Sequence, residues 1–460
     1  MQQSYQVLVV KNMDCKEHEA FLIDEDSLEN HTDKHSDIID QRMIPSKLVY
    51  LLVFAYFGSY MPYINTFLIS VGLTTSQAGL IYGTRLLITM CVGPIWGLLA
   101  DYTGYRRVIF VVLCLGTALF IFPSPWIAKY FACNGKEVQP NAIDDTNTSS
   151  THVFYAMLVI GSISAPFDDP LIGYVDSAVV NVVKSSQNDA TYGRQRMMGS
   201  IGFGLANLLA GYAADNYTPE HMSKYTAIFF VFLPSILLLI PVGLILFNQG
   251  DWQTNPNKSN NQVFSQVLVV LKNKENWMFF LTVVVNSIAT GINFGFVYLL
   301  MEEYMNSTKL IMGVSMTVAC ATELVFLAFS SSIIKFLGGT MPATIIASLS
   351  HAIRYILISY VENPWLVLPL QGMKCLGVAL FWTSAIEKVT TITEREVRST
   401  MIGLLNSIHY ALGPAIAIFV GGYLYEIYGG RYFFRIVGMV FSVWTIVVLI
   451  YHLISVRQRK

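Results

Sequence analysis

Runs of about twenty predominantly apolar residues recur along the whole chain, and each run is long enough to cross the hydrocarbon core of a bilayer as a helix. The composition agrees with that pattern, because only 13% of the 460 residues are charged, whereas a soluble domain carries about 25%. The sequence therefore predicts an all-α membrane protein that crosses the bilayer many times. The net charge of −1 indicates no particular partner, and we expect a lipid bilayer but no nucleic acid.

The apolar runs predict twelve transmembrane helices in two six-helix halves. The longest inner linker, residues 248–276, separates an N-terminal half at 47–247 from a C-terminal half at 277–456. Residues 1–46 are polar and have no sustained apolar period, so we expect a disordered cytosolic tail, and residues 457–460 form a short cytosolic C-terminus. The predicted spans lie near residues 47–70, 76–100, 106–125, 152–182, 197–215, 225–247, 277–300, 310–335, 341–361, 365–388, 399–425 and 432–456.

The basic residues predict the orientation in the membrane. Lysine and arginine concentrate in the tails and in the loops that follow even-numbered spans, whereas only five of the 29 lie in the opposite loops. By the positive-inside rule both termini lie in the cytosol. The loop at 126–151 is then exterior, and Asn147 begins a usable glycosylation sequon, Asn-Thr-Ser. An exterior sequon favours the plasma membrane over an endosomal membrane, although both share this topology.

A charged hairpin joins the second and third predicted spans. One apolar run ends at Ala100, and the chain then reads Asp-Tyr-Thr-Gly-Tyr-Arg-Arg before the next run begins. Only a tight turn fits so few residues, and Gly104 supplies its backbone conformation. Asp101 faces Arg106 and Arg107, which predicts a charge lock between neighbouring helices that latches an inner gate.

Between two long apolar runs, this hairpin resembles the signature loop of the major facilitator superfamily, which joins the second and third of twelve helices. The resemblance implies two six-helix halves that rock around a central cavity. Two positions depart from the pattern, because Tyr102 and Tyr105 stand where that loop commonly carries basic residues. A weaker latch is one consequence to expect.

Charged side chains inside the predicted spans are the candidate functional residues, since a charge at membrane depth needs a partner or a water-filled cavity. Arg196 can reach back to Asp176 across a helical hairpin, and such a pair either braces helices or clamps a hydroxyl-rich or anionic solute. Asp168 is a candidate cap for a helix break at Pro166 and Pro170. Structural pairing is the competing interpretation for each candidate. The full set is Arg85, Asp168, Asp169, Asp176, Glu323, Arg354 and Lys374.

Three strings sharpen the resemblance: Gly-Pro-Ile-Trp-Gly-Leu-Leu-Ala-Asp101, Tyr-Gly-Arg-Gln-Arg-Met-Met-Gly199 and Glu-Val-Arg-Ser-Thr400. Over about residues 47–455 they resemble the branch that contains lactose permease, and within it the animal major facilitator superfamily domain-containing protein six group. In lactose permease a fourth-span carboxylate and the second arginine of the Gly-Arg-x-Arg string form the sugar site. Asp176 and Arg196 hold the matching positions.

The second half of the chain matches that permease less completely. Arg354 and Lys374 keep the spacing of its ninth-span arginine and a later histidine, with lysine in place of histidine. Its proton-carrying carboxylate is replaced by Gly377, so Glu323, which matches an eighth-span glutamate common in the branch, is the remaining candidate for coupling. A cluster of Glu323, Arg354 and Lys374 would couple substrate or ions, or would be a structural triad. Arg85 is in turn a candidate gate or solute contact.

Together these features predict a monomeric secondary transporter that moves a small polar organic solute by alternating access, with protons as candidate coupling ions. The sequence contains no phosphate-binding Gly-Lys-Ser/Thr loop, zinc motif or nucleophile elbow, which argues against an ATP-driven pump, an enzyme and a bound cofactor or metal. The alternative is a transporter-like receptor or scaffold that moves no solute. Gly377 and the softened signature loop favour that alternative.

Overall fold

The computed structural model of the chain describes residues 43–134, 145–185, 192–217, 219–220, 222–249, 270, 272, 274–393 and 398–459. Residues 42–460 cluster into one compact unit, and the predicted tail at 1–46 lies almost entirely outside the described residues. All regular elements in the described part are helices, and twelve of them are long and apolar enough to cross a membrane. The predicted fold class is confirmed.

The N-terminal half supplies the first six spans. Each span is a helix or a pair of helices in sequence, and the chain passes back and forth between the two ends of the bundle. The elements are α2 (Ile44–Tyr60), η2 (Met61–Tyr63) and α3 (Ile64–Ser70), then α4 (Thr75–Thr103), α5 (Arg106–Ile121) with α6 (Ser124–Asn134), α7 (Asp145–Ser164) with α8 (Asp168–Ser185), α9 (Tyr192–Asn216) and α10 (Thr226–Gln249).

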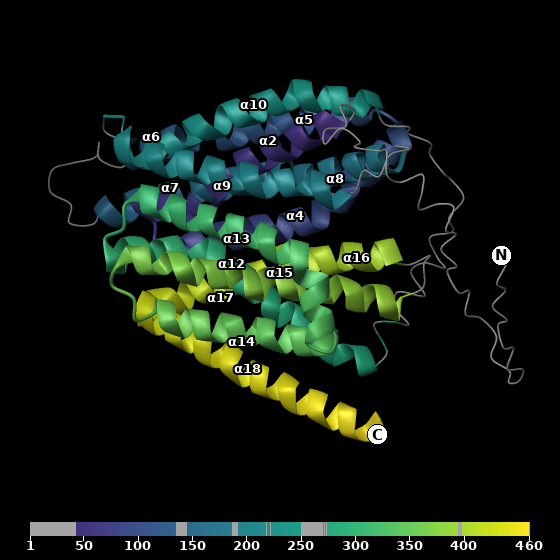
Figure 1. Cartoon of the computed structure of the whole chain (residues 1–460). Coiled ribbons are helices and arrows are strands. Elements are labelled where there is room, and N and C mark those ends of the chain that lie inside the picture. Colours follow the sequence, from purple (N-terminus) through teal and green to yellow (C-terminus); the bar gives the residue numbers. More distant parts are fainter. Residues whose placement is uncertain are drawn as a thin grey trace, which may run out of the picture. The chain divides into compact units, whose positions relative to one another are not determined.

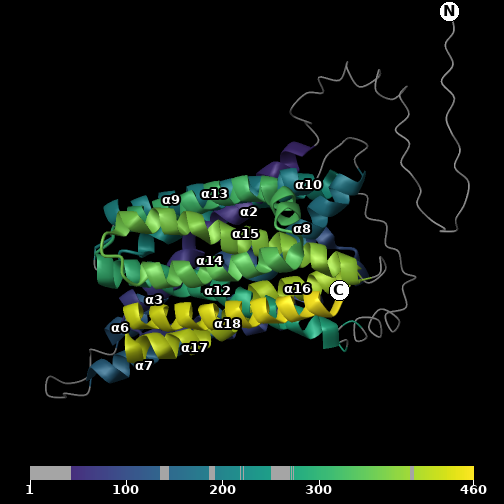
Figure 2. The same ribbon diagram turned by 60° about the horizontal axis from the view of Figure 1, so that its bottom comes forward.

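The C-terminal half supplies the other six spans. In Figure 1 this half, in green and yellow, lies below the N-terminal half, in purple and teal. Turning the molecule shows α18 lying along α14 (Figure 2). The elements are α12 (Lys274–Met305), α13 (Lys309–Phe336), α14 (Thr340–Ile358), η3 (Pro364–Leu366) with α15 (Val367–Ile392), α16 (Arg398–Ser407), η4 (Ile408–Leu412) and α17 (Gly413–Tyr428), and α18 (Gly430–Arg459).

The predicted spans agree with these helices to within a few residues at most boundaries, but the predicted exterior loop at 126–151 is too long. Helix α6 continues the third span to Asn134, and α7 already begins at Asp145. Asn147 therefore belongs to the first turn of α7, and its side chain lies outside the described residues. The turn at Gly104 has the left-handed conformation expected of it, with φ of 71°.

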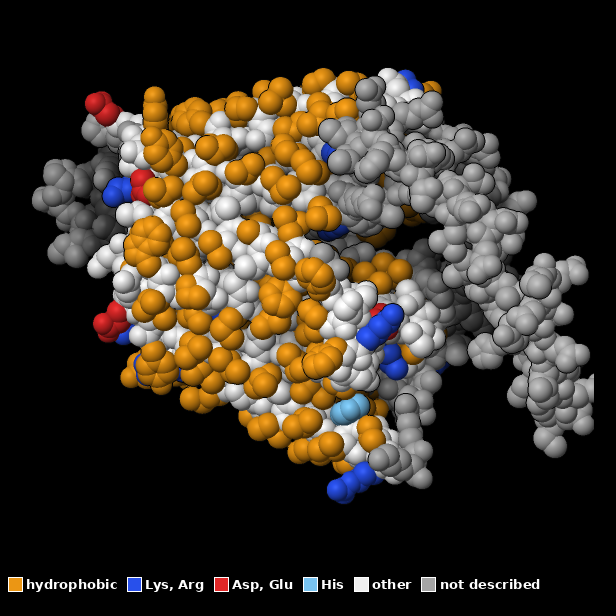
Figure 3. Space-filling view, viewed as in Figure 1, with side chains coloured by type: hydrophobic (Ala, Val, Ile, Leu, Met, Phe, Trp, Pro, Cys, Tyr) orange, Lys and Arg blue, Asp and Glu red, His pale blue; other side chains and the backbone are white. Residues whose placement is uncertain are grey.

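The outer surface of the helices suits lipid. Figure 3 shows hydrophobic side chains along the length of the helices and charged side chains gathered toward their two ends. Large apolar residues such as Leu119 and Val443 are more than 60% exposed there. A soluble protein rarely exposes so continuous an apolar surface, whereas a membrane-spanning bundle requires it.

Several spans are interrupted, and two of the interruptions lie in the fourth and eleventh spans. The fourth span is non-helical at 165–167, because Pro166 lacks an amide hydrogen and disfavours a helical conformation at Ala165. Helix α8 then restarts at Asp168, and Pro170 is tolerated in its first turn. The eleventh span widens into the π-helical segment η4 at its middle. The first break fixes the position of the carboxylates discussed below.

Candidate functional site

The two halves join at one end of the bundle. We call the end at which α2 begins and α18 ends the terminal face, and the opposite end the distal face. Among the described residues, the hydrogen bonds that link the halves all lie toward the distal face. They join the first span and α9 to α12 and α13, α4 to α17, and Tyr225, just before α10, to α12. The structure is therefore closed at the distal face.

Glycines allow this close approach. A Cβ atom at Gly313 would lie 2.7 Å from the carbonyl oxygen of Asn207, and one at Gly79 would lie 2.7 Å from that of Ile418. Small residues let helix backbones approach closely in lipid, where no hydrophobic force drives helices together. Both glycines belong to the contacts between the halves.

Two carboxylates complete the closure by capping helices of the opposite half. Asp215 of α9 accepts hydrogen bonds from the backbone N–H groups of Lys309 at 3.0 Å and Leu310 at 2.7 Å, in the first turn of α13. Glu426 of α17 accepts one from the backbone N–H of Ser76 at 2.8 Å, in the first turn of α4. These N–H groups have no partner within their own helices, and a negative charge is favourable there.

The terminal face is more open. Cβ atoms placed at Gly93 and Gly97 on α4, or at Gly403 on α16, would meet no other atom within 4 Å. Leu98 on the same part of α4 is 66% exposed. Within the described ranges, no hydrogen bond joins the halves on this side of the molecule.

An aromatic contact spans the two halves near the middle of the bundle. The ring of Phe203 on α9 lies 6.2 Å from that of Phe57 on α2 and 6.1 Å from that of Phe294 on α12. The Lys374 ammonium lies 5.3 Å from the centre of the Phe294 ring and 3.8 Å from the sulfur of Met316. A buried cation is thus placed next to the boundary between the halves.

Lys374 and Arg354 are both buried cations, and neither forms an ion pair with a described carboxylate. Arg354 is fully buried and donates to the side-chain oxygen of Asn293 at 2.7 Å, to that of Gln371 at 2.8 Å and to the carbonyl of Leu370 at 3.0 Å. One of its nitrogens, Nη1, has no hydrogen-bond partner. Neutral dipoles stabilise these charges only in part, so the C-terminal half can accept an anionic group.

Glu323 does not join the two cations. It is half-buried on α13 and makes no ion pair with Arg354 or Lys374. Its neighbour Thr322 contacts the sulfur of Cys375 on α15 at 2.9 Å, so α13 and α15 are in contact at this level. The structure brings the three predicted residues to adjacent helices without forming the predicted charge cluster.

The predicted pair of Asp176 and Arg196 is present. Arg196 Nη1 donates to both carboxylate oxygens of Asp176, at 2.8 and 3.0 Å, and Tyr50 donates to the same carboxylate at 2.6 Å. The Asp176 side chain is 27% exposed and the Arg196 side chain is 33% exposed. The Arg196 guanidinium lies over the ring of Phe54, 5.3 Å from its centre. Because both side chains are partly exposed, either one can leave the other and contact a solute without a new charge becoming buried.

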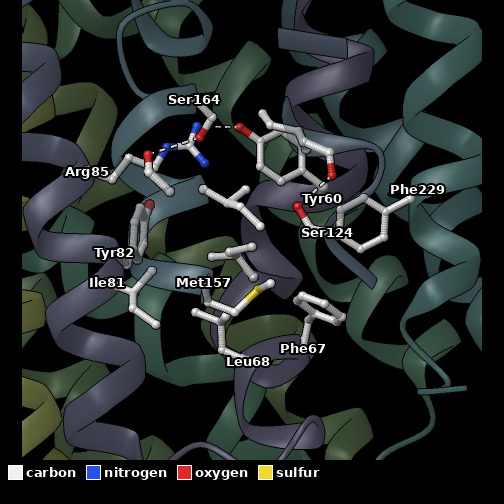
Figure 4. Close-up of a pocket in the computed structure, with 14 residues that line it drawn as sticks. Tyr60, Phe67, Leu68, Ile81, Tyr82, Arg85, Ser124, Met157, Ser164 and Phe229 are labelled. Carbon is white, nitrogen blue, oxygen red and sulfur yellow. Dashed lines mark hydrogen bonds between the residues drawn. The ribbon is translucent and has the colours of Figure 1, made fainter. Parts of the chain in front are cut away.

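Arg85 lies in a cluster that sequence reasoning did not assemble. Its guanidinium forms an ion pair with Asp168, approaches Asp169 at 3.6 Å and donates to the Tyr60 hydroxyl at 2.7 Å. Asp168 does not cap the helix break, because its carboxylate instead accepts from Arg85 and Tyr60. Arg85 is 4% exposed, so in this conformation it contacts carboxylates within its own half. Figure 4 shows it with Tyr60 at one end of a pocket.

His351 is a residue that sequence reasoning missed. It lies one turn before Arg354 on α14, and its ring occupies the space beside Gly377, where any side chain would overlap it. The ring stacks on Tyr355 with an interplanar angle of 14°. A histidine on the Arg354 face of the helix was the available signal, since residues three apart lie on one face. The absent carboxylate at Gly377 is thus replaced in space by an imidazole.

The predicted latch can be described only in part. The side chain of Asp101 lies outside the described residues, Arg106 is half-buried, and Arg107 is exposed at the start of α5. The Arg106 carbonyl accepts a hydrogen bond from Tyr174 of α8 at 2.9 Å. The hairpin therefore contacts α8, and its gating role stays a prediction.

Comparison with known families identifies the fold's relatives. Residues 43–436 match the model of the MFS_1 like family, a match that covers every predicted span except most of the last. The chain belongs to the MFS_1 like family. It is 25% identical over 419 residues to the maltose permease of Geobacillus stearothermophilus, covering 90% of this chain and 94% of the permease. It is 21% identical over 378 residues to the uncharacterized transporter YwbF of Bacillus subtilis (strain 168), covering 82% and 85%.

Solved structures give the same result for the fold. The chain resembles the nucleoside transporter NupG with a TM-score of 0.69 and 14% identity, over 89% of this chain and 98% of NupG. A D-xylose-proton symporter gives 0.58 and 13% identity, over 88% and 96%. As a member of the MFS_1 like family, the chain is a multi-pass membrane transporter of the major facilitator type.

Proposed function

We propose that this chain is a secondary transporter that moves a small polar organic solute by alternating access. The observation that carries the proposal is the asymmetry of the contacts between the halves, which are hydrogen-bonded at the distal face and open around Gly93, Gly97 and Gly403. Rocking of two halves about a central site needs contacts that form on one side and separate on the other. A permanently closed bundle would need contacts at both ends.

The solute binds between the halves, with one half supplying an ion pair and the other supplying buried cations. Asp176 and Arg196 contact donor and acceptor groups of the solute from the N-terminal half, and Arg354 and Lys374 bind an anionic or acceptor-rich group from the C-terminal half. Lys374 supports this assignment most, because its only described contacts are the Met316 sulfur and the Phe294 ring. A charge-assisted hydrogen bond to a solute would satisfy it better than either.

The family supports a transport role without defining the solute. Relatives carry sugars or nucleosides in their names, and a small polar solute fits both. The quoted strings around Asp101, Gly199 and Thr400 support a place in the lactose-permease branch, near the animal major facilitator superfamily domain-containing protein six group. We assign both termini to the cytosol and the protein to the plasma membrane, as a monomer, with Glu323 as a coupling candidate. In that orientation the distal face is exterior and the structure is inward-facing.

A thermal-stability screen of the purified protein against sugars, nucleosides, organic acids and amines tests the proposal. A solute that binds only the folded state stabilises it by mass action, by about 2.7 kcal/mol at a hundredfold excess over its dissociation constant. We expect a stabilising solute whose effect is lost in Asp176→Asn and Lys374→Met, and whose uptake is saturable in proteoliposomes. A response without uptake would replace transport by a receptor role, and no response to any class would contradict the solute site.

A further inference from the structure

The cluster around the break in the fourth span has an excess of negative charge in the membrane interior. Arg85 contributes one positive charge, and Asp168 and Asp169 contribute two negative ones. Asp168 is fully buried and the Asp169 side chain is 14% exposed. Both aspartates lie in the first turn of α8, whose N-terminus offsets part of this charge, and a further positive charge would offset the rest.

The cluster also has unused polar atoms. Asp168 Oδ1 is buried and has no hydrogen-bond partner among the described residues, although its other oxygen contacts both Arg85 and Tyr60. Asp169 Oδ2 accepts from Thr89 at 3.0 Å. A fully buried carboxylate oxygen without a donor calls for a proton or a cation, because buried polar groups are otherwise satisfied.

The backbone at this point adds oxygen atoms. The chain is non-helical at 165–167, where side chains of α4 bond the carbonyl groups: the Ala165 carbonyl accepts from the Thr89 hydroxyl at 3.3 Å, and the Pro166 carbonyl accepts from Trp96 Nε1 at 2.5 Å. Discontinuous membrane helices in transporters commonly bind coupling cations through such carbonyls and nearby carboxylates. The described residues hold no group of three metal-ligating His, Cys, Asp or Glu side chains, which argues against a multivalent metal.

We propose that Arg85, Asp168, Asp169 and the broken segment of the fourth span form a binding site for one monovalent cation, a proton or Na⁺. The site is separate from Asp176 and Arg196, since Asp176 lies two turns farther along α8. The proposal rests on the proposed transport function, for which it supplies the driving ion. It moves the coupling role from Glu323 to the N-terminal half.

The pocket in Figure 4 adjoins this site through Tyr60 and Arg85. It lies within the N-terminal half on the distal side of the cluster, where Arg85, Tyr60 and Ser164 form one end and Phe67, Leu68 and Met157 line the rest. The hydroxyl groups of Tyr82 and Ser124 add polar surface to an otherwise apolar lining.

Two chains of contact connect the site with the rest of the transporter. Gly83, two residues before Arg85 on α4, packs against Phe419 of α17 across the distal interface. Tyr60, which bonds both Arg85 and Asp168, lies 6.2 Å ring to ring from Phe57, the first member of the aromatic contact that leads to Lys374. A cation that neutralises the excess negative charge of the cluster would therefore bind close to both the distal interface and the proposed solute site.

The groups that face the two carboxylates are defined on every packed element. Tyr56 and Tyr60 come from α2, and Tyr82, Arg85 and Thr89 come from α4. Phe232 of α10 packs against the rings of Tyr56 and Tyr60, and Ser164 of α7 lines the adjoining pocket, so these two elements add no charged group.

Infrared titration of the purified full chain tests the site, with protons and Na⁺ as the probes. The carbonyl-stretch band of protonated carboxylic acids is followed against pH in choline chloride and in NaCl, for the unchanged protein, Asp168→Asn, Asp169→Asn and the control Glu362→Gln. Glu362 is an 82% exposed carboxylate at the distal face. Thermal unfolding of each variant reports whether it is folded, and Asp169→Asn carries the test where Asp168→Asn does not fold.

We expect the unchanged protein and Glu362→Gln to show the band of a buried carboxyl that responds to pH, and Asp169→Asn to lack it. The lost band intensity should correspond to one carboxyl. A lower titration midpoint in NaCl than in choline identifies Na⁺ as the ligand, and equal midpoints identify the proton. If both aspartate variants titrate like the unchanged protein in both salts, the proposed site is overturned. The solute screen does not depend on this band. If a solute stabilises the protein but the aspartate variants titrate like the unchanged protein, the cation site alone is refuted. If the variants lose the band but no solute stabilises the protein, the proposed function alone is refuted.

Discussion

Asp215 and Glu426 occupy equivalent positions in the two halves. Each lies near the distal end of the fifth helix of its half, and each caps the first turn of the second helix of the other half. The two contacts are thus related by the internal symmetry of the fold. Both must break before the distal face can open.

Removing one of these caps should loosen the interface at both places. We expect Asp215→Ala to cost about 1 kcal/mol, as for other N-cap losses, and to speed amide exchange at Lys309 and Leu310 roughly fivefold. If the halves open as units, exchange at Ser76 rises as well. Hydrogen–deuterium exchange measures both sites. Faster exchange confined to Lys309 and Leu310 would show a local cap without a shared gate, and Glu362→Ala is the matched control.

Lys374→Met should separate stability from function. The substitution removes a buried cation that has no described counter-ion, so the free energy of unfolding should rise, by up to about 2.5 kcal/mol. Solute binding should be lost, because the group that recognises the anionic end is gone. Thermal unfolding with and without solute measures the two effects together. A less stable variant that still binds solute would show that Lys374 is structural, and the exposed Lys335→Met serves as control.

Exchanging the members of the Asp176–Arg196 pair distinguishes a brace from a binding site. Each single substitution, Asp176→Arg or Arg196→Asp, breaks a pair with contacts of 2.8 and 3.0 Å. The double variant restores an ion pair in reverse, and we expect it to recover thermal stability while its solute response stays at least tenfold weaker. Such a decrease corresponds to about 1.4 kcal/mol of binding free energy. Recovery of both properties would identify the pair as a brace.

Glycosylation at Asn147 tests the predicted orientation. Expressed in animal cells, the protein should lose apparent mass on glycosidase treatment, and Asn147→Gln should remove that shift. Residue 147 belongs to the first turn of α7, at the distal end of the fourth span. An unchanged size after treatment of the natural sequence would contradict an exterior distal face or its processing. Asn257→Gln is the control, since Asn257 begins the sequon Asn-Lys-Ser within the inner linker at 248–276, which is predicted to be cytosolic.

The sequence predicts the spans well because length and hydropathy alone decide which segments cross a bilayer. It also predicts the Asp176–Arg196 contact, since the hairpin between α8 and α9 brings neighbouring helix ends together. The Arg85 cluster could not be predicted, because it depends on how α4 and α8 are rotated about their axes and on the break before Asp168. Asp215 and Glu426 likewise resemble ordinary surface carboxylates until the opposite half is placed against them. The sequence did not predict the position of His351, because a carboxylate was the group expected at position 377. The space beside Gly377 is instead filled by an imidazole ring from another helix.

The most direct test of alternating access measures two distances in one protein by double electron–electron resonance. In a background without the native cysteines, one spin-label pair at Tyr217 and Glu362 reports the distal face, and another at Tyr105 and Phe336 reports the terminal face, where all four side chains are exposed. The account predicts that the double variant Asp215→Ala with Glu426→Ala gains a population in which the distal pair is farther apart and the terminal pair closer together. If neither distance changes, or if both change in the same direction, the halves do not rock about a central site and the account is contradicted.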